Sequence, residues 1–128
     1  MTSENSSLPD AVLVVCLCAQ WCGVCGDYRA RFAQVQAKFP QATFLWVDVE
    51  DEADLLYPMD IENFPTLLLV VGGKPRFFGP LTPQVELLER LVRAQVQGSA
   101  GAALGDPELL ALVAKILATL PDRPGFYT

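Results

Sequence analysis

The sequence predicts a single α/β domain in which helices flank a central mixed sheet of about four strands. The chain has 128 residues, of which 52% are apolar, so it is long enough to bury one core and too short for two domains. Apolar runs typical of buried strands alternate with stretches in which apolar residues recur every three or four positions. A short glycine-containing link between the last two strand-like runs indicates an antiparallel hairpin.

The first half of the chain predicts a strand, a helix and a strand. Residues 1–10 are polar and are expected to form a flexible lead-in, whereas residues 11–19 are apolar almost without a break, as in a strand buried on both faces. A helix that ends at Pro40 should follow, because one apolar stripe has helical spacing, at Val24, Tyr28, Phe32, Val35 and Phe39. Residues 43–49 predict the second strand, and this order implies a parallel pair with a right-handed crossover.

The next segment predicts the hairpin. Residues 50–60 are acidic and should form a short helix or a loop. Residues 64–71 predict the third strand and residues 72–75 a turn. Residues 76–78 then begin a fourth strand that runs antiparallel to the third.

Two helices are expected in the last third of the chain. Residues 82–83 supply an N-cap threonine and a first-turn proline for a helix through about Val96, whose inner face carries Val85, Leu88, Leu91 and Val92. Residues 97–105 are rich in glycine and alanine and predict a linker. A further helix, capped by an aspartate and apolar over more than half of its circumference, is predicted over residues 106–120, before a tail over residues 121–128.

Two cysteines with redox spacing follow the first predicted strand, in the stretch Trp21-Cys22-Gly23-Val24-Cys25. The start of the first predicted helix matters here, because its unpaired N–H groups and the positive end of the helix dipole favour an anion. Only a thiolate attacks a disulfide. Cys22 is therefore the candidate nucleophile, and Cys25, one turn further on, is the candidate resolving thiol.

Charge and composition exclude some partners and suggest a compartment. The net charge of −6 argues against nucleic acid or an anionic membrane surface as a main partner. No segment approaches the roughly 18 apolar residues of a membrane span, and the start of the chain lacks the features of a secretory signal. We therefore expect the protein to be cytoplasmic. In the reducing cytoplasm, a cysteine pair at this spacing is more often a redox or metal site than a structural bridge.

A metal site is the alternative reading of the cysteines. Cys16, Cys18, Cys22 and Cys25 would supply enough thiolates for zinc or an iron–sulfur cluster. The first two lie within a predicted core strand, however, and the chain has no histidine. The sequence therefore favours a redox pair over a bound metal, although a cluster shared between two subunits through Cys22 stays conceivable.

The predicted core carries the motifs of a known family. These are the Trp-Cys-Gly-Val-Cys stretch, the run Asp-Ile-Glu-Asn-Phe-Pro-Thr at residues 60–66, and Gly79 after the fourth strand. With them, residues 11–96 resemble the thioredoxin family. The resemblance implies a thioredoxin-like fold and a thiol–disulfide oxidoreductase that reduces or exchanges disulfides in protein substrates, with Cys22 and Cys25 as its catalytic pair. Such a protein needs an external electron donor and no bound cofactor.

The resemblance also implies a substrate-binding surface. Pro65 is expected to follow a cis peptide bond and to lie opposite the two cysteines, and proline is the residue for which that bond costs little. The apolar surface around Cys22 would be formed by Trp21, Gly23, Val24, Phe64 and Gly79.

Three positions depart from the family pattern. Val24 replaces the usual proline between the cysteines and lends neither charge nor a hydrogen-bond donor, which favours a reductant or an intermediate potential over a strong oxidant. Cys16 occupies the position of a buried aspartate that helps to deprotonate the resolving thiol, and Trp46 that of a lysine, so both are predicted to be buried modulators. Because a buried thiol is a poor base, release of oxidised substrate should be slow and a mixed disulfide at Cys22 long-lived.

Cys16 and Cys18 lie two apart on a strand and therefore point to the same side. We expect both to be small buried hydrophobic residues. The alternative is that Cys16 lies beneath Cys25, where it could exchange with the active pair or act as a second resolving thiol.

The ends of the chain also depart from the family. Ten polar residues are too few for the family's usual first strand and helix, so the first strand is expected to be missing and the strand at residues 43–49 to be an exposed edge carrying Phe44 and Trp46. The added helix from Asp106 should complete the core rather than form a dimer contact, which predicts a monomer or a weak homodimer.

A second function is possible under the same resemblance. The rival to the oxidoreductase is a protein-binding module that keeps the cysteine pair but turns over little.

Overall fold

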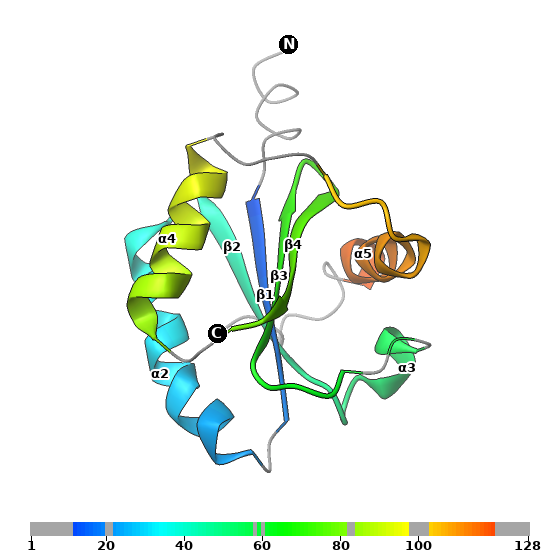
Figure 1. Ribbon diagram of the computed structural model, residues 1–128, viewed down its shortest axis with the longest axis horizontal. Coiled ribbons are helices and arrows are strands. Elements are labelled where there is room, and N and C mark those ends of the chain that lie inside the picture. The colour runs from blue at the N-terminus through cyan, green and yellow to red at the C-terminus, as the bar shows by residue number, and fades with distance from the viewer. Residues whose placement is uncertain are drawn as a thin grey trace.

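The computed structural model describes residues 12–19, 22–57, 59, 61–81, 84–97 and 103–119. Its helices and strands follow one another along the chain in the order that the sequence predicts (Figure 1). In chain order they are β1 (Val12–Cys18), α2 (Gly23–Lys38), β2 (Ala42–Asp48), α3 (Ala53–Leu56), β3 (Thr66–Val71), β4 (Lys74–Pro80), α4 (Val85–Val96) and α5 (Pro107–Thr119).

The four described strands form one mixed sheet in the order β2-β1-β3-β4. β1 and β2 are parallel, whereas β1 pairs antiparallel with β3 and β3 antiparallel with β4. The parallel pair and the hairpin are thus confirmed. The hairpin turn places Gly72 and Gly73 at φ of 59° and 81°, a region that glycine enters without the steric cost borne by other residues.

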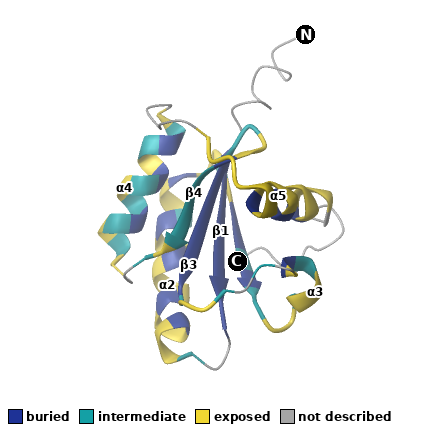
Figure 2. Ribbon diagram, turned by 45° about the vertical axis from the view of Figure 1, so that its right-hand side comes forward, coloured by how far each residue is buried: buried dark blue, intermediate teal, exposed yellow. Residues whose placement is uncertain are grey.

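Helices cover both faces of the sheet. Figure 1 shows α2 and α4 on one face and α3 and α5 on the other. All seven residues of β1 are buried, so alternate side chains of this strand enter two different core layers. Cys16 and Cys18 point toward α2 and α4, and Leu13, Val15 and Leu17 point toward α3 and α5. Figure 2 shows this central part of the sheet buried between the two helical layers.

The inner face of α2 begins one residue later than predicted. Val24 is 43% exposed, whereas Cys25 is only 2% exposed and heads the buried stripe that continues through Tyr28, Phe32 and Val35. Assigning Val24 to that stripe was wrong, because neighbouring helix positions differ by about 100° in direction and only one of the two can face the sheet. The helix ends at Lys38, just before Pro40, as expected.

The helix after β4 also begins later than predicted. α4 has Gln84 as its N-cap, with no side-chain cap hydrogen bond, and the predicted capping residues 82–83 lie outside the described residues. Its predicted inner face is confirmed: Leu88 and Val92 are buried, and Val85 and Leu91 pack on the same core layer.

α5 covers the second face of the sheet. The Glu108 backbone N–H donates to Asp106 Oδ1 at 2.9 Å, which is the predicted aspartate cap. Four apolar side chains of this helix are buried in the same layer as Leu13 and Val15 of β1: Leu109, Leu112, Val113 and Ile116. α5 therefore completes the core, as expected, and keeps Leu110 and Leu117 exposed on its outer side.

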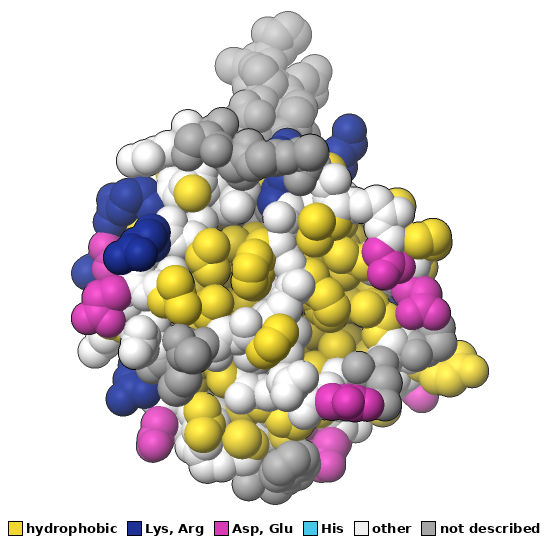
Figure 3. All heavy atoms as spheres, viewed as in Figure 1, with side chains coloured by type: hydrophobic (Ala, Val, Ile, Leu, Met, Phe, Trp, Pro, Cys, Tyr) yellow, Lys and Arg dark blue, Asp and Glu magenta, His cyan; other side chains and the backbone are white. Residues whose placement is uncertain are grey.

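Both edges of the described sheet carry large apolar side chains. In β2, Phe44 is buried and Trp46 is half-buried. In β4, Phe77 and Phe78 are half-buried, and Figure 3 shows apolar side chains on the face where β4 lies between α4 and α5. The expected absence of the family's first strand concerns residues before Val12, which lie outside the described part of the chain.

Candidate active site

Cys22 is a free, half-buried thiol at the start of α2. It is the N-cap of this 16-residue helix. Its N–H donates to the Ala19 carbonyl at 3.0 Å, and its own carbonyl accepts the first helical hydrogen bond, from the Gly26 N–H at 3.2 Å. The first turn, Gly23–Gly26, contains no acidic side chain, so no carboxylate offsets the positive end of the helix dipole beside this sulfur.

Cys25 is bonded to Cys18 in the structure. This disulfide joins the first turn of α2 to the last residue of β1, and the two Cα atoms are 5.7 Å apart, within the usual range for a disulfide. Both cysteines are at most 2% exposed. The expectation that Cys18 is only a small buried hydrophobic residue was therefore wrong.

Cys16 lies next to this disulfide and is not part of it. Its Sγ is 3.8 Å from Cys18 Sγ, and the residue is fully buried. Because a disulfide sulfur has no hydrogen, the Cys16 thiol is the donor in this contact. Sequence reasoning found the correct face of the strand, but the cysteine that reaches Cys25 is Cys18, because the start of α2 lies beside the end of β1.

The chemical state of Cys16 follows from its burial. Burial raises the pKa of the Cys16 thiol far above its ordinary value, although the positive charge of Arg29 opposes this shift. Cys16 therefore remains a protonated thiol near neutral pH and offers no base at this position, as the sequence predicts.

Trp46 is the register partner of Cys16 across the β1–β2 pair. It is half-buried rather than buried, because it lies on an edge strand of the described sheet. Its ring packs edge-on against Phe32 at 5.6 Å between centroids, and the Arg29 guanidinium carbon lies 5.0 Å from the ring centroid. The prediction of Trp46 as a buried modulator is corrected accordingly.

Tyr28 lies near the buried cysteines, although the sequence analysis assigned it only to the core. It lies one turn after Cys25 and is fully buried, and among the described residues its hydroxyl has no hydrogen-bond partner. Burial and then the nearby Cys16 raise the pKa of Tyr28 well above its ordinary value. The sequence did contain a sign of this position. Tyr28 follows Cys25 by three residues, a spacing that brings both side chains to the same face of a helix.

The segment before β3 enters the sheet next to the end of β1. The Phe64–Pro65 peptide bond is cis, as expected. In the β1–β3 register Leu17 pairs with Thr66, so this segment and the start of α2 lie at the same end of the sheet. Phe64 and Cys22 also pack against the same core layer.

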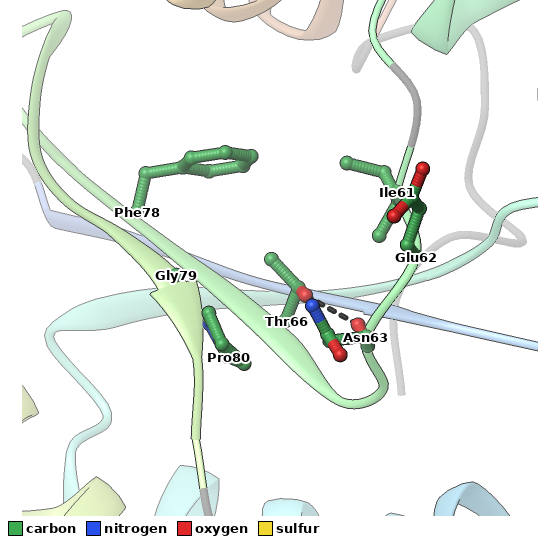
Figure 4. Close-up of a pocket in the computed structure, with 7 residues that line it drawn as sticks. All are labelled: Ile61, Glu62, Asn63, Thr66, Phe78, Gly79 and Pro80. Atoms are coloured by element: carbon green, nitrogen blue, oxygen red, sulfur yellow. Dashed lines mark hydrogen bonds between the residues drawn. The ribbon is translucent and has the colours of Figure 1, made fainter.

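The other predicted substrate-binding residues are placed as follows. Gly23 and Val24 are exposed in the first turn of α2, whereas Trp21 lies outside the described residues. Gly79 is half-buried and lines a cavity of about 170 Å³ at the carboxyl end of β4, whose walls do not include Cys22 (Figure 4). The lining residues are Ile61, Glu62, Asn63, Thr66, Phe78, Gly79 and Pro80.

The described residues include neither a membrane-spanning helix nor a metal-binding cluster. Within them, no helix is both long enough and apolar enough to cross a membrane. In that same part of the chain, no group of three or more His, Cys, Asp or Glu side chains is arranged to hold a metal ion.

Comparison with known proteins assigns the family. The Thioredoxin family model matches residues 4–89. The chain is similar to thioredoxin H2-2 of Oryza sativa subsp. japonica, with 30% identity over 70 residues that cover 55% of this chain and 52%, about half, of the relative. It is also 30% identical to thioredoxin H4-2 of the same organism over 98 residues, covering 75% of this chain and 72% of the relative.

A solved structure shows the same fold. The X-ray structure of Fasciola hepatica thioredoxin aligns with a TM-score of 0.59 and 22% sequence identity, covering 72% of this chain and 88% of that one. The mixed four-stranded sheet flanked by helices is therefore a thioredoxin-like fold. Because the family model matches well over half of the chain, the chain belongs to the thioredoxin family.

Proposed function

We propose that this protein is a thiol–disulfide oxidoreductase that reduces or exchanges disulfides in protein substrates, with Cys22 as the attacking thiol and Cys25 as the resolving thiol. The observation that carries the proposal is the position of Cys22. It is a free thiol, half-buried at the N-cap of α2, one helical turn before Cys25 and at the end of the sheet where Pro65 enters β3. Disulfide exchange requires an accessible cysteine as its nucleophile, and Cys22 is the free one at this end of the sheet.

The proposed reaction starts from the reduced protein. The Cys22 thiolate attacks one sulfur of a substrate disulfide, forms a mixed disulfide and releases the other substrate sulfur as a thiolate. The Cys25 thiolate then attacks Cys22 Sγ, and the second substrate sulfur leaves. The substrate gains two electrons and the protein is oxidised by two. An external dithiol donor returns them, so this cycle needs no bound cofactor.

The substrate surface is proposed from the residues around the free thiol. Gly23 and Val24 are exposed beside Cys22, and Phe64 packs against the same core layer as Cys22. An extended segment of a protein substrate would lie across this surface, with Trp21 and Gly79 as further contributors implied by the family. We place this activity in the cytoplasm.

Insulin reduction with dithiothreitol as the electron donor tests the proposal. We expect the full chain to accelerate precipitation of the insulin B chain over the rate with dithiothreitol alone. No acceleration at any protein concentration would contradict the proposed activity.

The second candidate function is a protein-binding module with little turnover. The observation that favours it is the protonated, buried Cys16 in the position where the family has a base. Under this alternative, insulin reduction stays at the background rate and Cys22 forms no mixed disulfide with insulin.

Introducing a base at position 16 should shorten the life of the mixed disulfide. We expect Cys16→Asp to shorten the lifetime of the Cys22–insulin adduct at pH 7 by about tenfold or more, because a positioned general base contributes about 10²–10⁴-fold to proton transfer. Acid quenching followed by mass spectrometry measures the lifetime. Cys16→Asn is the matched control, since it has a similar size and polarity but no base. An equal lifetime in the two variants would show that the missing base does not limit substrate release.

A further inference from the structure

We propose that Cys18 is a third redox-active residue of this protein. After turnover, Cys18 forms a disulfide with Cys25 and thereby releases Cys22 as a free thiol. This inference rests on the proposed function, because the exchange starts from the Cys22–Cys25 disulfide formed in that reaction. The structure supplies the product of the exchange: Cys18 bonded to Cys25, with Cys22 free.

The geometry allows Cys25 to be approached from two sides. Cys22 precedes it by one turn of α2, whereas Cys18 is the last residue of β1 and lies across the interface between the sheet and the helix. In the bonded state the Cα atoms of Cys18 and Cys25 are 5.7 Å apart, within the usual range for a disulfide. The Val49 N–H donates to the Cys18 carbonyl at 2.8 Å, which ties the end of β1 to the chain after β2.

The surroundings of the new bond accommodate a disulfide. Cys18 and Cys25 are 1% and 2% exposed, and both belong to the apolar layer between the sheet and α2. A disulfide carries no charge and needs no hydrogen-bond partner, so it can be buried in such a layer without an electrostatic cost. Cys22, in contrast, is half-buried and remains accessible for the next reaction.

The exchange step is balanced in atoms and electrons. The Cys18 thiol gives up its proton, and its sulfur attacks Cys25 Sγ. The Cys18–Cys25 bond forms, the Cys22–Cys25 bond breaks, and Cys22 leaves as a thiolate. The proton lost by Cys18 balances the one that the Cys22 thiolate can take up, so one disulfide is exchanged for another and no external oxidant or reductant takes part.

The consequence is a change in what the oxidised protein can do. With the bond between Cys22 and Cys25, the attacking thiol is blocked. With the bond between Cys18 and Cys25, Cys22 can still attack a substrate disulfide, but Cys25 is occupied and cannot resolve the adduct. The oxidised protein would then hold its substrate covalently until a donor reduces the Cys18–Cys25 bond.

Differential labelling of the full chain tests the inference. The reduced protein is oxidised with one equivalent of diamide, free thiols are blocked with N-ethylmaleimide, and disulfide thiols are then reduced and alkylated with iodoacetamide. The first basic residue of the chain is Arg29, so one tryptic peptide carries all four cysteines and fragment spectra assign each label. We expect N-ethylmaleimide on Cys22 and iodoacetamide on Cys18 and Cys25 in most molecules.

Two variants sharpen the result. In Cys18→Ala the maleimide label on Cys22 should be lost, because Cys22 and Cys25 then form the bond. Cys16→Ala is the matched control, since Cys16 lies on the same strand and face and is outside the disulfide, and it should keep the wild-type pattern. Wild-type protein with iodoacetamide on Cys22 and Cys25, and Cys18 unpaired, would overturn the inference.

The two proposals fail separately in these experiments. If the labels show the Cys22–Cys25 bond while insulin is reduced, the role of Cys18 is refuted and the oxidoreductase activity stands. If the labels show the Cys18–Cys25 bond while insulin is not reduced, the proposed activity fails, and with it the turnover that the exchange was meant to follow.

Discussion

Replacing Cys22 with serine should lower the rate of insulin reduction above the dithiothreitol background by about 1,000-fold or more, as expected when an enzyme loses its attacking group. The serine hydroxyl keeps the size of the side chain at the start of α2 but does not ionise near neutral pH. The readout is the initial rate of B-chain precipitation at equal protein concentration.

Ala30→Ser is the control for the Cys22 variant. It adds the same hydroxyl to the same helix at an exposed position outside the first turn, and it should retain the wild-type rate. Substantial insulin reduction by Cys22→Ser would mean that another cysteine attacks the substrate, and the proposed mechanism would be wrong.

Shortening Ile116 to alanine should lower the free energy of unfolding by about 2–5 kcal/mol, because its side chain is fully buried between α5 and the sheet. Leu117→Ala is the matched control on the same helix. Leu117 is 41% exposed, so its loss should cost about 1 kcal/mol or less. Urea denaturation followed by tryptophan fluorescence gives both values.

The comparison of these two variants tests the role of α5. Equal, small losses in both would show that the helix does not cover the sheet. A large loss in Leu117→Ala together with a concentration-dependent stability would instead indicate that the outer side of the helix is a dimer contact.

The succession of strands and helices along the chain could be predicted from the sequence because apolar runs and helical stripes differ in period. The apolar run at residues 11–19 is typical of a strand buried on both faces. The parallel pair and the hairpin follow from the lengths of the connections. The start of α2 was less well predicted. Whether Val24 or Cys25 faces the sheet depends on the rotation of the first turn, which the apolar stripe alone does not determine.

The disulfide pairing could not be predicted from spacing. Cys18 and Cys25 are seven residues apart, and only the path of the chain from the end of β1 into α2 brings them together. Alternation along the strand placed Cys16 and Cys18 on the correct face but could not say which one reaches Cys25. The position of Tyr28 beside the buried cysteines was missed because its aromatic ring fits the apolar stripe of the helix, which assigns it to the core alone.

The position of a trapped substrate tests the central claim most directly. Reduced Cys25→Ser protein is mixed with insulin, quenched with acid and digested, and the cysteine that carries an insulin chain is identified by mass spectrometry. We predict a stable adduct on Cys22. An adduct on Cys18 or Cys16, or none at all, would contradict the assignment of Cys22 as the attacking thiol.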